Sequence, residues 1–131
     1  MAGAFFPPRP RKLDPVDASQ ELQDSLLSFA QSCNSNARLA SMIRDWNRTL
    51  HVHATDGAGD YALVTSTGTV TITPGAPAAS DLALQATGDI LTQIFYGELS
   101  PNEPYNAGTL RLVGPEADIV RLDFVIAMLW E

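Results

Sequence analysis

Residues 97–114 read GELSPNEPYNAGTLRLVG, and this stretch contains the clearest structural signals in the chain. Ser100 and Glu103 stand at the spacing of a capping box, and Pro101 lies between them at the first helical position. Both features mark the start of a helix. The helix must be short, because Gly108 follows and glycine commonly ends helices.

A strand is predicted directly after this helix, over residues 109–113. Leu110 and Leu112 alternate with Arg111 there, which is typical of a strand with one buried face. Gly114 and Pro115 break the strand. Residues 115–130 then have helical character.

This last predicted helix carries more apolar surface than a helix on a sheet normally uses. One stripe consists of Ile119, Leu122, Ile126 and Leu129. A second stripe beside it consists of Val120, Phe124 and Ala127, and the apolar surface is widened by Val125, Met128 and Trp130. A single stripe about 100° wide is usual for such a helix. The surplus indicates a ligand cavity, a dimer interface or a more tightly packed core.

Alternation of apolar and polar residues predicts four further strands upstream, at about 50–55, 61–65, 69–73 and 81–86. The first three are joined by short turns and should form an antiparallel meander. Helices are predicted from Asp17 to about Asn34, after a cap at Ser35 or Asn36, and after a cap at Thr87. The fold class is therefore α+β, with a five-stranded, mostly antiparallel sheet and helices packed on one face.

The composition fits one domain, and we expect it to span residues 17–131. The 131-residue chain is 45% hydrophobic and has no run of about 18 apolar residues that could cross a membrane. Residues 1–16 hold four prolines without helical periodicity, which predicts a flexible, dispensable arm. The net charge of −7 disfavours a nucleic-acid partner, and the single cysteine excludes an internal disulfide. Membrane contact is expected to be transient at most.

The histidines, the cysteine and the carboxylates of the sequence do not form a recognisable catalytic set, so we expect no enzymatic activity. His51 and His53 share one strand face, but the sequence offers neither another histidine nor clustered cysteines to complete a metal site. We therefore expect two solvated polar residues and no metal. Cys33 has no base tied to it and should be a small, semi-buried apolar residue. Carboxylate pairs such as Glu116 and Asp118 lie at a predicted helix start, where solvation explains them.

Residues 97–114 resemble the sterol carrier protein-2 family, whose pattern here is Gly-x-Leu-x-Pro, an aromatic residue, a glycine, an alternating strand and another glycine. The predicted meander at 50–73 also follows that family, so the resemblance covers about residues 37–130. This sequence departs from the family pattern at Pro115-Glu116, where the family usually has a small polar residue and a looser turn. The sequence ends at Glu131 without the peroxisomal Ser-Lys-Leu signal of animal carriers, so we expect a cytoplasmic protein.

The resemblance implies an apolar tunnel between sheet and helices that accepts a sterol, a fatty acid or an acyl chain. Carried over position by position, its lining would be Ile90, Ile94, Phe95, Leu99, Tyr105, Leu112, Leu122, Val125, Ile126 and Leu129. No cofactor and no catalytic residue is implied.

Two functions are compatible with this sequence. The first is non-enzymatic binding or transfer of a hydrophobic ligand. The second is an interaction module with the same fold and a collapsed tunnel, which uses the last helix to form a homodimer or to dock on an enzyme of a lipid or quinone pathway.

Overall fold

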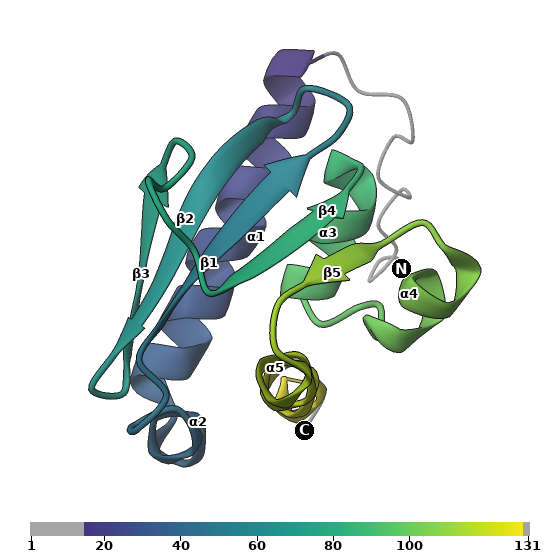
Figure 1. Ribbon diagram of the computed structural model, residues 1–131. Coiled ribbons are helices and arrows are strands. Elements are labelled where there is room, and N and C mark those ends of the chain that lie inside the picture. The colour runs from purple at the N-terminus through teal and green to yellow at the C-terminus, as the bar shows by residue number, and fades with distance from the viewer. Residues whose placement is uncertain (1–14, 130–131) are drawn as a thin grey trace, which may run out of the picture.

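A five-stranded sheet organises the computed structural model, which describes residues 15–129. The strands are β1 (Arg48–Ala54), β2 (Gly59–Ser66), β3 (Thr69–Pro74), β4 (Leu82–Ala86) and β5 (Arg111–Val113). They lie in the order β3-β2-β1-β4-β5, and only the β1–β4 pair among them is parallel (Figure 1). The predicted α+β class and the mostly antiparallel sheet are confirmed. Strand β5 is two residues shorter than the alternation predicts.

Five helices belong to the described part of the chain: α1 (Pro15–Ser35), α2 (Ala37–Met42), α3 (Gly88–Phe95), α4 (Asn102–Ala107) and α5 (Glu116–Met128). Two predicted caps are confirmed, because the side chains of Asn36 and Thr87 accept hydrogen bonds from backbone N–H groups of α2 and α3. Gly108 ends α4 in the left-handed conformation, at φ 83°. Helix α1 begins two residues before Asp17, and the rest of the predicted arm, residues 1–14, lies outside the described residues.

The longest helix, α1, packs against β3 and α3 on one side of the sheet (Figure 1). Its Phe29 ring meets the Phe95 ring of α3 edge-on, with the centroids 5.3 Å apart. Buried Leu22, Leu26 and Cys33 complete the apolar side of α1. The core therefore lies between the sheet and these helices, and it is the alternating Leu50, Val52 and Ala54 of β1 that face it.

Helix α3 is anchored at its start to the turn between β1 and β2. The Asp56 carboxylate accepts a hydrogen bond from the Gly88 N–H at 3.1 Å and another from the Ala58 N–H at 3.3 Å. A Cβ atom at Gly88 would lie 2.7 Å from the Ala58 Cβ, so glycine allows this close approach. The predicted turn lies one residue earlier than expected, at 55–58, and it also positions α3.

Helix α5 is anchored by a buried carboxylate that the sequence interpretation placed in solvent. Asp118 is buried and accepts a hydrogen bond from the Trp46 indole N–H at 2.8 Å. Arg48 Nε lies 3.1 Å from both carboxylate oxygens of Asp118. The expectation of a solvated Asp118 is therefore wrong, because its partners are about seventy residues away in the sequence.

None of the helices in residues 15–129 is both long enough and apolar enough to cross a membrane.

Candidate functional site

Most of the apolar residues that the family resemblance implied belong to the core of the domain. Five of them are buried in the core, namely Ile94, Phe95, Leu122, Val125 and Ile126. Four more are partly buried and pack against that core, namely Ile90, Leu99, Leu112 and Leu129. Tyr105 differs, because it is 47% exposed on α4. The described structure thus brings nine of the ten side chains to one apolar region and leaves Tyr105 at its surface.

Two surface hollows border this region. The smaller has a volume of about 230 Å³ and is lined by Ser100, Pro101, Asn102, Asp123, Ile126 and Ala127. The larger, of about 400 Å³, is lined by Thr55, Gln85, Ala86, Thr87, Ile90, Gly108, Thr109 and Arg111. Each hollow therefore includes one residue of the implied lining: Ile126 in the smaller, Ile90 in the larger.

The smaller hollow is lined by both polar and apolar residues. Asn102 of α4 donates a hydrogen bond from its side-chain amide to the Asp123 carboxylate of α5, across 3.3 Å. Ile126 also lines the hollow, and its side chain is buried. Such a lining suits an amphipathic ligand, since it offers apolar side chains together with an amide and a carboxylate group.

Side chains fill the space between the hollows. Ile94 and Leu122 have almost no exposed surface, and Phe95 packs against Phe29. A long ligand would therefore have to displace these side chains or part α3 from α5. A volume of 230 Å³ is below the usual range for pockets that hold drug-sized molecules, roughly 300–1,000 Å³.

The outer stripe of α5 faces solvent. Phe124 is 59% exposed and Val120 is 45% exposed, and they lie one helical turn apart. The inner stripe, which includes Leu122 and Ile126, faces the core. The surplus apolar surface predicted for this helix is thus present on its outer side.

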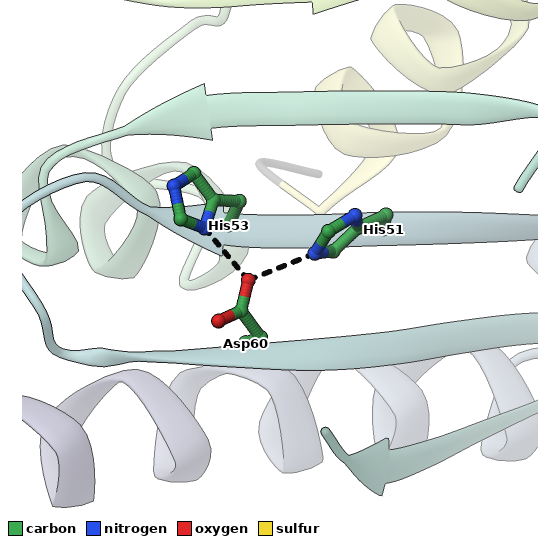
Figure 2. A group of neighbouring side chains, drawn as sticks. All are labelled: His51, His53 and Asp60. Atoms are coloured by element: carbon green, nitrogen blue, oxygen red, sulfur yellow. Dashed lines mark hydrogen bonds and ion pairs between the residues drawn. The ribbon is translucent and has the colours of Figure 1, made fainter. Parts of the chain in front are cut away.

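A polar cluster lies on the opposite side of the sheet from the core. His51 and His53 alternate with the buried residues of β1, and both rings point toward Asp60 of β2 (Figure 2). One carboxylate oxygen, Asp60 Oδ1, lies 2.8 Å from His51 Nε2 and 2.6 Å from His53 Nδ1. The three residues are all partly exposed.

The histidines shift the acidity of Asp60. Partial burial alone would raise the pKa of this carboxyl group, but hydrogen bonds from both rings and the charges of the imidazoles outweigh it and lower the pKa below its ordinary value. Asp60 is a residue that sequence reasoning missed. The predicted turn at 56–59 would place Asp60 opposite Thr55, whereas the observed turn at 55–58 pairs Asp60 with His53.

Cys33 is not a candidate nucleophile. Its side chain is buried, and desolvation raises the pKa of its thiol to about 12. A thiol with such a pKa carries almost no thiolate near neutral pH, and the thiolate is the reactive form. The prediction of a small, apolar structural cysteine is confirmed.

Comparison with known proteins identifies the architecture. No protein-family profile and no curated protein matches the sequence. A solved structure described as the UbiJ-SCP2 ubiquinone synthesis protein superposes with a TM-score of 0.68 over 82% of this chain and 94% of its own, at 13% identity. This chain has the sterol carrier protein-2 fold. Palmitated SCP2L2 from Aedes aegypti also matches, with a TM-score of 0.60 and 13% identity, over 79% of this chain and 93% of its own.

The same fold also occurs as part of a larger enzyme. The sec-alkylsulfatase Pisa1 from Pseudomonas sp. matches with a TM-score of 0.57 and 22% identity over 66% of this chain. This chain spans only 14% of the length of that enzyme. The SCP2 fold therefore forms nearly the whole chain of one neighbour and a small part of another.

Proposed function

We propose that this chain binds a hydrophobic small molecule, with its apolar part between α3 and α5, and that it does so without catalysing a reaction. The proposal rests on two observations: apolar side chains of both helices belong to one buried core, and a hollow lined by polar and apolar residues includes Ile126 of that core. The SCP2 fold, shared with a palmitated protein, supports an acyl chain or a sterol as the ligand class.

Exclusion of water would supply the binding energy. A buried acyl chain gains about 0.8 kcal/mol for each methylene, so ten methylenes approach 8 kcal/mol before the entropic cost of association. This free energy must also exceed the cost of separating α3 from α5, since side chains fill the interior. Asn102 and Asp123, which line the hollow, would hydrogen-bond a polar end, with Tyr105 of α4 at the surface.

A displacement assay tests this function. A fatty acid that carries a fluorescent nitrobenzoxadiazole group is bound to the protein, and its displacement by unlabelled palmitate is measured. The wild type should bind the probe, and Ile94→Trp should lose at least tenfold in affinity because the larger ring occupies the ligand's space. Overpacking should also cost Ile94→Trp about 1–3 kcal/mol of stability, which a urea titration measures.

Two control variants make the result specific. Ile94→Val removes one methylene, should cost about 0.5–1.5 kcal/mol, and should keep the affinity within a few-fold. Phe124→Asp alters only the exposed side of α5 and should bind the probe as the wild type does. Absence of probe binding by the wild type at micromolar concentrations would overturn the proposal.

The exposed stripe on α5 favours a second candidate, an interaction module. Val120 and Phe124 offer apolar surface to a second copy or to an enzyme of a lipid or quinone pathway. The SCP2-fold neighbour described as a ubiquinone synthesis protein is consistent with it. Sedimentation velocity over a range of concentrations separates the candidates: a module of this kind forms a dimer that Phe124→Asp abolishes, and it does not bind the fatty-acid probe.

A further inference from the structure

The polar cluster of His51, His53 and Asp60 lies on the side of the sheet away from the proposed lipid site, and its composition is that of a metal centre. Two imidazole nitrogens and a carboxylate oxygen converge, with all three ligand atoms within 4.8 Å of one another. Imidazole and carboxylate donors together suit zinc and its neighbours copper and nickel. Three protein ligands with an open fourth position also describe many zinc sites that bind water or substrate.

We propose that His51, His53 and Asp60 form a binding site for one divalent transition-metal ion of the zinc class. The three side chains come from adjacent strands, so the backbone fixes their spacing. His53 and Asp60 are direct partners in the β1–β2 register, and His51 lies two residues from His53 on the same face. A site built on paired strands changes little in geometry when the ion binds.

The ligand atoms need only a small rearrangement. An ion with bonds of 2.0–2.2 Å in tetrahedral geometry separates its ligand atoms by roughly 3.3–3.5 Å. The two ring nitrogens now lie 2.8 and 2.6 Å from Asp60 Oδ1, so these separations must open by about half an ångström to one ångström. Rotation about side-chain bonds achieves this, because the side chains of His51, His53 and Asp60 are 26%, 40% and 36% exposed.

The metal would replace hydrogen atoms that now connect the rings to the carboxylate. When neutral, each ring donates the N–H that faces Asp60, from Nε2 of His51 and Nδ1 of His53. Binding an ion at those nitrogens moves each hydrogen to the other nitrogen of its ring through solvent. The carboxylate exchanges two hydrogen bonds for one metal bond, and the exposed side leaves the fourth position open to water.

Zinc binding to the full-length, tag-free protein tests the proposal by isothermal titration. We expect one Zn²⁺ per chain and at least tenfold weaker binding by each of His51→Gln, His53→Gln and Asp60→Asn. Asp45→Asn is the matched carboxylate control, since the Asp45 side chain is 88% exposed and lies outside the cluster, and it should bind as the wild type does. Circular dichroism verifies that each variant is folded.

Cobalt gives an independent readout of the ligand set. Co²⁺ bound to the wild type should show visible absorption of a four-coordinate complex, and the variant that lacks both histidines should not. The proposal is overturned if the wild type binds no more Zn²⁺ than that variant does, or if Asp60→Asn leaves the affinity unchanged. In either case His51, His53 and Asp60 form only a hydrogen-bonded link between β1 and β2. The lipid-probe assay is separate from both measurements, so one result does not depend on the other.

Discussion

Individual residues carry much of the connection between distant segments, and Asp118 is the clearest case. The Asp118 carboxylate accepts hydrogen bonds from the indole of Trp46 and the guanidinium of Arg48. It therefore joins α5 to the start of β1 and the segment before it. Removing it leaves the buried Trp46 N–H without its partner, whereas the partly exposed Arg48 can turn toward water.

We expect Asp118→Ala to lower the free energy of unfolding by about 2–3 kcal/mol, because a buried donor without a partner is costly. Asp118→Asn keeps an acceptor for the indole and should lose only about 1 kcal/mol. Urea denaturation followed by circular dichroism measures both. Asp45→Ala, at an exposed ion pair, should stay within about 0.5 kcal/mol of the wild type. Equal stability of Asp118→Ala and the wild type would contradict the anchoring role.

Cys33 leads to a prediction about pH. The folded-state pKa of about 12 lies above the value of an unfolded thiol, so the unfolded chain releases its proton first as the pH rises. The contribution of Cys33 to stability is complete below about pH 8.5 and decreases between that value and about pH 12. Cys33→Ala should therefore show a smaller loss of stability between pH 8 and 10 than the wild type does.

Thiol labelling gives a second check on Cys33. A thiol-specific reagent such as dithiobis(nitrobenzoic acid) should react slowly with native protein at pH 8 and rapidly in denaturing urea. Rapid labelling of the native protein would show that Cys33 is accessible, contrary to its complete burial.

At the scale of elements, α5 has two sides with opposite tolerance to charge. Leu122 faces the core at 2% exposure, and Phe124 faces solvent. We expect Leu122→Asp to lose more than about 4 kcal/mol or to prevent folding, because it buries an unpaired carboxylate. Phe124→Asp should stay within about 0.5 kcal/mol. Urea titrations of the two variants measure the contrast; a large loss for Phe124→Asp in dilute monomer would mean that this side is covered.

The elements that the sequence predicted well are those with local signals. Period-two alternation locates the strands, and the sequence marks helix boundaries at Ser35 or Asn36, at Thr87 and at Gly108, because a cap or a turn depends on neighbouring residues alone. The shortening of β5 was not predictable in this way, since β5 pairs only with Ala83, Leu84 and Gln85 of β4, and this register involves a distant segment.

At the scale of the whole molecule, the parts of the candidate sites that escaped prediction depend on contacts between distant segments. The carboxylates of Asp118 and Asp60 look like ordinary surface groups in the sequence. They acquire partners only when α5 meets β1 or when β2 pairs with β1. The apolar residues of α3 and α5 come from the family resemblance, and the structure places them in one core, which periodicity alone could not show.

The parallel pairing of β1 with β4 has a consequence for how the chain is made. During synthesis β1 can pair at once with β2 on one side, whereas its other edge waits for β4, which begins at Leu82. At about 5–20 residues per second, the wait lasts a few seconds, during which backbone groups of a central strand are open to solvent and to other chains.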